Sequence, residues 1–197
     1  MVVLSVVALV AVGVAAAAHV KVHLLPTGRN PLRDAVSDYG VGPYRSWYRT
    51  TVVGLAIASA SLTVAFARDG GPGVGSLIAL AVFGASRLAI AWFPVDLPGE
   101  PATQTGRVHN LLAVAAFASI AVAASSIPDG LTATAWSGKA NGLNLLGAVV
   151  MWVAIATGVF FAVAPLRRWF GLVERALYWA TFGWLTLAAA DLLAIYS

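Results

Sequence analysis

The chain has 197 residues, of which 60% are hydrophobic and only 10% are charged. This composition excludes a water-soluble domain, predicts a membrane protein, and leaves no room for a separate soluble unit. The formal net charge of +4 does not indicate nucleic-acid binding, because Lys and Arg collect in the cytoplasmic loops of membrane proteins. There is no cysteine, which excludes disulfides, thiolate metal ligands and cysteine nucleophiles.

Six apolar runs follow one another along the chain, separated by breaks rich in glycine and proline. They lie at Val2–Leu25, Thr51–Ala67, Ser76–Phe93, Val108–Ile127, Leu143–Ala164 and Leu177–Ile195. Their length suits a bilayer core about 30 Å thick, and they lack the alternating polarity of barrel strands. The predicted fold is therefore all-α, with residues 1–197 forming a single domain of six transmembrane helices.

The first run contains four alanines, Ala15–Ala18, that resemble a signal-peptide cleavage site. No positive charge precedes the run, and its removal would leave the basic segment that follows outside the cell. We therefore expect the run to be retained as the first helix.

The distribution of basic residues between the loops predicts the orientation. Loops two and four contain only Arg68 and Lys139. Loops one, three and five contain nine basic residues: Lys21, Arg29, Arg33, Arg45, Arg49, Arg107, Arg167, Arg168 and Arg175. The positive-inside rule places these three loops in the cytoplasm and both termini outside a plasma (inner) membrane.

Loop one is the longest connection, and its sequence predicts local structure. Asn30 followed by Pro31 is typical of a helix N-terminus, and Gly40 is typical of the position after a helix C-terminus. We therefore predict a short helix, Leu32–Tyr39, lying at the membrane surface.

Two ionisable residues fall inside apolar runs, where charge is costly and often functional. At 1.5 Å per residue, Arg87 lies about 9 Å and Asp191 about 21 Å from the cytoplasmic side, so they are not expected to pair. We expect Arg87 to turn toward the cytoplasm and bind Asp96 or Asp38. Asp191 should reach the outer interface or be buried beside groups such as Trp184. Snorkelling to the interface is the alternative for both.

Further polar residues are predicted at one depth on the cytoplasmic side. With Arg87 they could line a cavity open to the inner leaflet and support anion binding or acid–base chemistry. Alternatively, the carboxylates hold Arg87 and cap helices, while the histidines lie at the interface. The residues are His19, His23, Ser37, Asp38, Tyr39, Asp96 and His109.

A metal or haem site is a sharper interpretation of the histidines. His19 and His23, with His109 and Asp96, would supply a zinc ligand set, and two histidines on facing helices could ligate haem. A single HxxxH pattern arises by chance, and no adjacent Glu completes a hydrolase motif. We therefore predict no metal ion and no cofactor.

Three segments resemble a bacterial and archaeal membrane family, domain of unknown function 998. Residues 30–40, NPLRDAVSDYG, are similar to its "dPLRdaISEyg" segment, with Val36 in place of Ile and Asp38 in place of Glu. Residues 93–96 (FPVD) and 106–109 (GRVH) are similar to its "FPtD" and "GrlH" segments, and residues 171–175 (GLVER) to its "GLvqR" segment. The resemblance implies a six-helix fold and a shared polar set of Ser37, Asp38, Asp96 and His109, but no activity. A more distant similarity is to the Frag1/DRAM/Sfk1 membrane proteins.

Three functional hypotheses remain open at this stage. The first is a protein that binds or moves a lipid or amphipathic small molecule, with Ser37, Asp38, Tyr39, His23 and Arg87 lining the cavity. The second is a membrane-embedded enzyme acting on a lipid or isoprenoid, with Asp96 and His109 as its acid–base pair. The third, an assembly or regulatory subunit, predicts no cavity. Neither the ligand nor the oligomeric state is predicted by the sequence.

Overall fold

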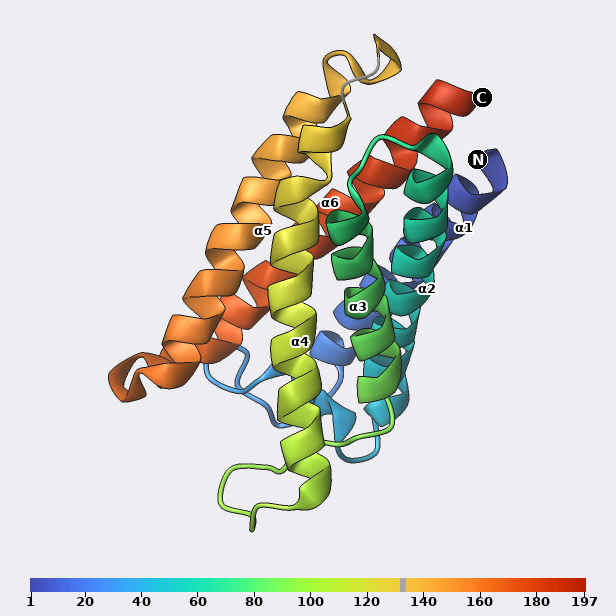
Figure 1. Ribbon diagram of the computed structural model, residues 1–197. Helices are drawn as coiled ribbons and strands as arrows, with labels where there is room; N and C mark the ends of the chain where they lie inside the picture. The colour runs from blue at the N-terminus through green and yellow to red at the C-terminus, as the bar shows by residue number, and fades with distance from the viewer. Residues whose placement is uncertain (132–133) are drawn as a thin grey trace.

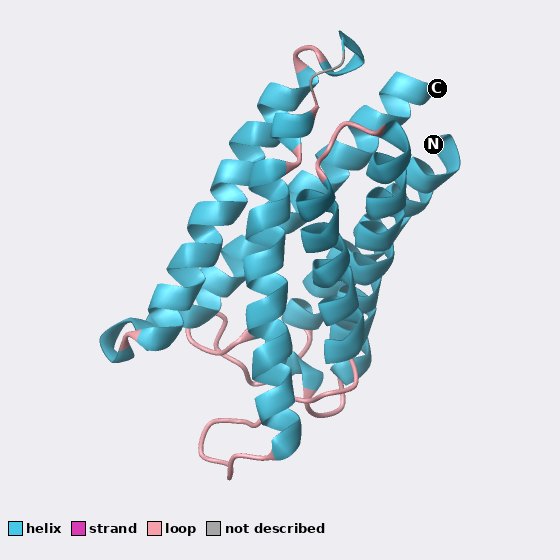
Figure 2. Cartoon of the chain, in the orientation of Figure 1, coloured by secondary structure: helices cyan, strands magenta, loops and turns pink. Residues whose placement is uncertain are grey.

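The computed structural model describes residues 1–131 and 134–197, and over these residues it contains six long helices, four short 3₁₀ segments and no strand (Figures 1 and 2). The long helices are α1 Val2–Leu24, α2 Arg45–Asp69, α3 Val74–Ile90, α4 Gln104–Ser126, α5 Lys139–Ala162 and α6 Phe170–Tyr196. The 3₁₀ segments are η1 Val36–Gly40, η2 Pro128–Gly130, η3 Thr134–Trp136 and η4 Ala164–Trp169. The all-helical part of the predicted fold is confirmed.

The helices run up and down, and each packs against its neighbours in the chain. Helix α6 returns to α1, so the six helices form a closed ring. Both termini and the α2–α3 and α4–α5 connections lie at one end, here called the terminal end (Figure 1). The α1–α2, α3–α4 and α5–α6 connections lie at the other end. We call it the basic end, because these are the loops rich in arginine.

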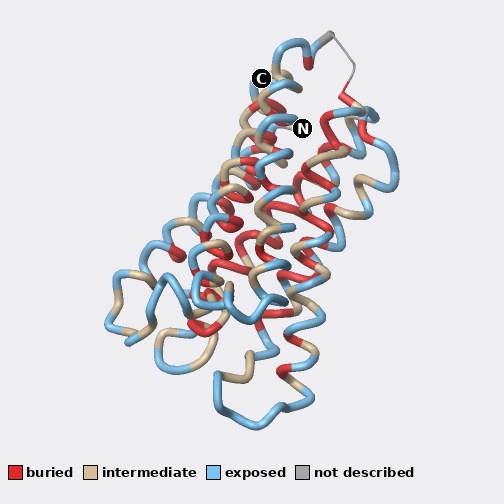
Figure 3. The backbone as a smooth tube through the Cα atoms, turned by 90° about the vertical axis from the view of Figure 1, so that its left-hand side faces the viewer, coloured by how far each residue is buried: buried red, intermediate tan, exposed pale blue. Residues whose placement is uncertain are grey.

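Apolar side chains cover the outside of the bundle as well as its interior. Buried residues follow the inner faces of the helices (Figure 3), yet Val3 is 74% exposed and Leu145 is 70% exposed. Five helices are long and apolar enough to cross a membrane, and α3, Val74–Ile90, is a shorter apolar helix. An apolar outer surface on such helices indicates a multi-pass membrane protein.

Each helix after α1 begins earlier than the sequence predicted, and the difference is largest in α2 and α6. Helix α2 begins at Arg45 rather than Thr51, and α6 begins at Phe170 rather than Leu177. The prediction stopped each helix where charged residues begin, but charge does not end a helix when its side chains find partners. In α6 this adds about two turns. They carry Glu174 and Arg175, both of which are buried and hydrogen-bonded to loop one.

The predicted surface helix Leu32–Tyr39 is wrong in its extent. The Oδ1 atom of Asn30 accepts a hydrogen bond from the N–H of Leu32, which forms a turn instead of a helix start. Ala35 is extended, with φ −63° and ψ 151°, so only Val36–Gly40 forms a 3₁₀ segment. Gly40 ends this segment without a positive φ; a Cβ atom there would lie 2.9 Å from the Tyr48 ring.

Several polar groups at the terminal end contact one another. Asp69 at the end of α2 accepts hydrogen bonds from the indole N–H of Trp136 and the hydroxyl of Tyr196. Asp191 is buried, and its Oδ1 atom lies 3.5 Å from the Nζ atom of Lys139, a partner that the sequence did not predict. These contacts join α2, α5 and α6 where the chain has no basic loop.

Candidate functional site

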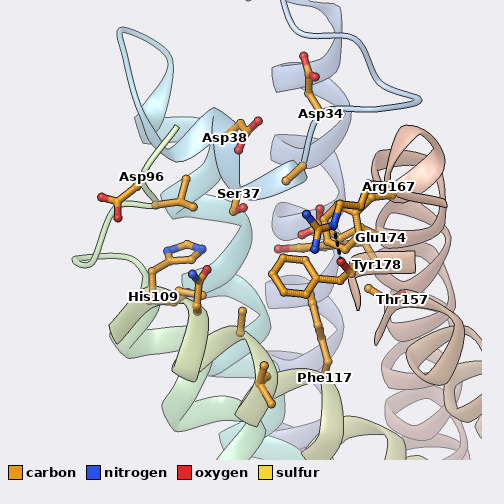
Figure 4. A pocket seen from close by; sticks show the side chains of 18 of the residues that line it. Asp34, Ser37, Asp38, Asp96, His109, Phe117, Thr157, Arg167, Glu174 and Tyr178 are labelled. Atoms are coloured by element: carbon orange, nitrogen blue, oxygen red, sulfur yellow. Dashed lines mark hydrogen bonds between the residues drawn. The ribbon is translucent and has the colours of Figure 1, made fainter. Parts of the chain in front are cut away.

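A cavity of about 650 Å³ opens at the basic end, between α3, α4, α5 and α6 and beneath loop one (Figure 4). Its volume lies within the range of about 300–1,000 Å³ that is typical of small-molecule sites. Its walls combine apolar and aromatic side chains with a limited number of polar groups. The polar and charged lining residues are Arg33, Asp34, Ser37, Asp38, Tyr48, Arg87, Asp96, His109, Asn110, Thr157, Arg167, Glu174 and Tyr178.

The cavity reaches the outer surface of the bundle between α4 and α5. Val114 on α4 and Phe161 on α5 both line it, and they are 64% and 56% exposed. The two helices are held together near the terminal end, where a Cβ atom on Gly147 would overlap the carbonyl oxygen of Ala124. They diverge toward the basic end (Figure 1). The cavity therefore has a lateral opening on the apolar outer surface of the bundle.

Arg87 lies in the wall of this cavity and is only 3% exposed. One of its terminal nitrogens donates a hydrogen bond to the Tyr178 hydroxyl at 3.0 Å. Its guanidinium carbon lies 5.4, 5.0 and 4.9 Å from the ring centres of Phe83, Phe117 and Tyr178. Its Nε atom has no hydrogen-bond partner in the described part of the chain. Three aromatic faces stabilise the cation but leave most of its N–H donors free.

The predicted ion pair between Arg87 and Asp96 or Asp38 is wrong, because each carboxylate has another partner. Asp96 accepts hydrogen bonds from the backbone N–H and the hydroxyl of Thr103, at 2.8 and 2.7 Å. In Figure 4 its carboxylate points away from the group formed by Phe117, Glu174 and Tyr178. These hydrogen bonds from Thr103 hold the pKa of Asp96 below its usual range.

Asp38 belongs to the loop-one side of the cavity. Its carboxylate lies 3.8 Å from the guanidinium of Arg29. Burial raises the pKa of Asp38, and the charge of Arg29 opposes that shift. Asp38 therefore already has a cation of its own.

His109 lines the opposite wall and is 2% exposed. Its Nδ1 atom lies 2.6 Å from the carbonyl oxygen of Phe93, which can only accept, so the proton is assigned to Nδ1. The neutral ring then keeps a lone pair on Nε2. The structure places Asp96 near the start of the same helix, but the hydrogen bonds described for the two side chains do not join them.

Sequence reasoning missed three side chains at the buried end of the cavity: Tyr48, Glu174 and Tyr178. Each is at most 4% exposed. Glu174 accepts a hydrogen bond from the backbone N–H of Val36 at 2.7 Å. Glu174 and Tyr178 are four residues apart and share one face of α6. That spacing was visible in the sequence, but Glu174 was assigned to a loop, so the two were not combined.

His23 and Tyr39 do not line this cavity, although they were predicted to belong to it. Both bind Arg175, which donates to His23 Nε2 at 2.7 Å and to the Tyr39 hydroxyl at 3.1 Å. The His19 and His23 rings lie 4.5 Å apart, so they do share a face, as predicted. His19 is packed against the rings of Tyr178 and Phe182.

Five of the predicted residues are therefore brought together: Ser37, Asp38, Arg87, Asp96 and His109. Within residues 1–131 and 134–197, no three His, Cys, Asp or Glu side chains are grouped so that they could hold a metal ion. The arrangement places a buried cation with one described hydrogen bond near hydroxyl and imidazole groups and beside an apolar opening.

Comparison with known protein families gives a match over nearly the whole chain. The family described as "Protein of unknown function (DUF998)" matches residues 9–191, which is nearly the whole chain and includes every lining residue of the cavity. This match confirms the resemblance carried by the loop segments. Neither the curated proteins nor the solved structures gave a significant match.

Proposed function

We propose that this protein, which belongs to the DUF998 family of proteins of unknown function, binds or moves a lipid or amphipathic small molecule in a cavity open to the cytoplasmic leaflet. In this proposal all six helices cross the plasma (inner) membrane, the basic end faces the cytoplasm, and both termini lie outside. Arg87 holds the anionic group of the ligand, and the lateral opening accommodates its apolar part.

The observation that carries the proposal is that Arg87 is buried with few hydrogen-bond partners. A guanidinium keeps its charge when buried, and burying an uncompensated charge is costly. Arg87 is 3% exposed, yet it makes only one hydrogen bond and no ion pair with the described residues. An anionic ligand would supply the missing acceptors within the cavity.

The cavity's apolar part supports an amphipathic rather than a fully polar ligand. Ile90, Ala113, Val114 and Phe117 line it together with Phe161. The opening between α4 and α5 faces the apolar surface of the bundle. A head group could therefore reach Arg87 while an acyl or isoprenoid chain stays in the bilayer.

The test is binding of a defined anionic amphipath, lysophosphatidylglycerol, measured by native mass spectrometry in a mild detergent. Arg87→Gln should weaken binding about 10- to 100-fold, the effect of losing a charge-assisted hydrogen bond to an anion. The matched control is Arg107→Gln, which removes an exposed arginine at the same end of the bundle. Equal binding by the protein, the Arg87 variant and the control would refute this role for the cavity.

The orientation has its own test, made simple by the absence of native cysteine. A cysteine at Ser137, in the α4–α5 connection, should react with an impermeant thiol reagent on intact cells. A cysteine at Ala102, in the α3–α4 connection, should react only after the membrane is opened. The reverse pattern would place the basic end outside.

A membrane-embedded enzyme is the second candidate, and His109 is the observation that favours it. A buried neutral imidazole with a free Nε2 can accept a proton from a bound substrate. Asp96 is already bound to Thr103, so its acid–base role has less support than that of His109. Chemical change in a bound lipid that His109→Gln abolishes, without loss of binding, would favour the enzyme.

A further inference from the structure

The buried end of the cavity contains a basic and an acidic side chain that do not pair. Arg87 and Glu174 are each 3% exposed and both line the cavity. No nitrogen and oxygen of the two side chains lie within 4.0 Å of one another, and neither forms an ion pair with any other residue that the structure describes. Arg175, the neighbour of Glu174 in sequence, directs its described hydrogen bonds to other acceptors.

The other charged lining residues already have partners. Asp34 binds Arg33 at 3.2 Å, and Asp38 faces Arg29 at 3.8 Å. Asp96 is held by Thr103 and Arg167 by the carbonyl oxygen of Phe161. Among the lining residues that the structure describes, Arg87 and Glu174 are the basic and the acidic side chain that are both buried and without an ion pair.

The two groups are close enough for one small ligand to reach both. Residues four apart on a helix have Cβ atoms about 5–6 Å from one another, so Glu174 lies one turn of α6 from Tyr178. The Tyr178 hydroxyl in turn accepts a hydrogen bond from Arg87. Figure 4 shows Glu174 and Tyr178 side by side on the same wall of the cavity.

Glu174 has only part of its capacity occupied. Its Oε2 atom accepts one hydrogen bond, from the N–H of Val36, and a carboxylate can accept several more. On the other side, Arg87 donates one described hydrogen bond, to the Tyr178 hydroxyl, whereas a guanidinium has five N–H donors. Donors and a carboxyl acceptor therefore line one cavity a short distance apart.

We propose that the polar end of the ligand is a zwitterion, with an anionic group bound by Arg87 and a primary ammonium a few bonds away bound by Glu174. This inference rests on the proposed function and narrows its ligand class. Phosphoethanolamine has this chemistry, either as a lipid head group or as a free small molecule. A primary ammonium suits the site better than a quaternary one, because it can donate N–H hydrogen bonds to the Glu174 carboxylate.

The test compares three lysophospholipids with one acyl chain: lysophosphatidylethanolamine, lysophosphatidylglycerol and lysophosphatidylcholine. Native mass spectrometry should show the ethanolamine lipid binding about tenfold more tightly than the other two, the effect of one charge-assisted hydrogen bond. Glu174→Gln should remove this preference but keep binding of the glycerol lipid. Glutamine keeps an oxygen that can accept from Val36, so loop one remains attached.

The matched control is Asp129→Asn, an exposed carboxylate-to-amide change at the terminal end, which should leave the preference unchanged. Equal affinity for the ethanolamine and glycerol lipids in the unaltered protein would overturn the zwitterion, whether or not the variant folds. So would a preference that survives Glu174→Gln. Binding of both lipids that does not depend on Arg87 would instead overturn the proposed function itself.

Soluble O-phosphoethanolamine serves as a competitor and distinguishes the two sources of the head group. If it displaces lysophosphatidylethanolamine in a manner that depends on Glu174, a water-soluble zwitterion is the ligand. If it does not compete while the ethanolamine preference holds, the apolar chain is required and the ligand is a lipid. Both results support the zwitterion.

Discussion

Two arginines at the basic end are buried to nearly the same degree but differ in how many hydrogen bonds they make. Arg87 is 3% exposed and Arg175 is 8% exposed, and neither forms an ion pair with the described residues. Arg87 makes one hydrogen bond and faces a cavity. Arg175 makes four, to His23 Nε2, the Asp34 carbonyl, the Gly171 carbonyl and the Tyr39 hydroxyl.

The difference separates a structural cation from one available to a ligand. Arg175 uses neutral acceptors from α1, loop one and its own helix, so it fastens the loop that covers the cavity. Its bond to His23 requires the imidazole to be neutral with the proton on Nδ1, which lies 2.6 Å from the His19 carbonyl oxygen. Arg87 makes one described hydrogen bond, to Tyr178, so most of its N–H donors remain available to a ligand.

The largest expected effect on stability follows from Arg175→Gln. Removing the guanidinium leaves several buried acceptors without donors, which should lower the free energy of unfolding by about 3 kcal/mol. Arg87→Gln should cost about 1 kcal/mol, because the lost aromatic contacts are offset by relief of an uncompensated buried charge. Thermal unfolding in detergent, without added lipid, measures both.

The exposed Arg107→Gln variant gives the baseline for a simple loss of charge in that comparison. Similar destabilisation by the Arg87 and Arg175 changes would show that both arginines are structural. Arg87 would then no longer support the proposal that the cavity binds an anionic ligand.

Much of the fold could be predicted because apolar runs dictate helices regardless of their partners. Helix ends were harder: Glu174 and Arg175 look like loop residues until their contacts with loop one are known. Arg87 was identified correctly as an unusual residue, since charge inside an apolar run is visible in one dimension. The sequence did not identify Tyr178 as its partner. Whether Arg87 meets Asp96 or Tyr178 depends on how the helices pack, which the spacing of residues along the chain does not give.

A smaller loss of stability should distinguish Tyr39→Phe, in loop one, from Tyr44→Phe, just before α2. Tyr39→Phe removes an acceptor of Arg175 and leaves a buried N–H unsatisfied, at a cost of about 1–2 kcal/mol. The ring itself remains, so the contact 5.6 Å from the guanidinium carbon is kept. Tyr44→Phe is the control, because its hydroxyl makes no hydrogen bond to the described residues. Equal melting temperatures for the two variants would show that the hydrogen bond between Arg175 and Tyr39 does not stabilise loop one.

The smallest effect on stability is expected for Asp96. Like Arg175, this residue holds a loop against a helix rather than facing a ligand. It binds the first turn of α4 through Thr103, and a Cβ atom on Gly106 would overlap its carboxylate. Its pKa is lowered in the folded protein, chiefly by the hydroxyl of Thr103. The bound carboxylate therefore stabilises the fold above the ordinary carboxyl pKa of about 4, and that contribution disappears as the pH falls through the lower folded value.

Asp96→Asn should accordingly lower the melting temperature slightly at pH 7. The difference from the unaltered protein should shrink as the pH is reduced from about 5 toward the lowered pKa of Asp96. Because Asp96 and Arg87 share no contact, the melting-temperature changes of Asp96→Asn and Arg87→Gln should add in the double variant. Partial recovery in that double variant would mean that the two charges pair after all. Arg87 would then have a partner within the protein, and its burial would no longer support binding of an anionic ligand.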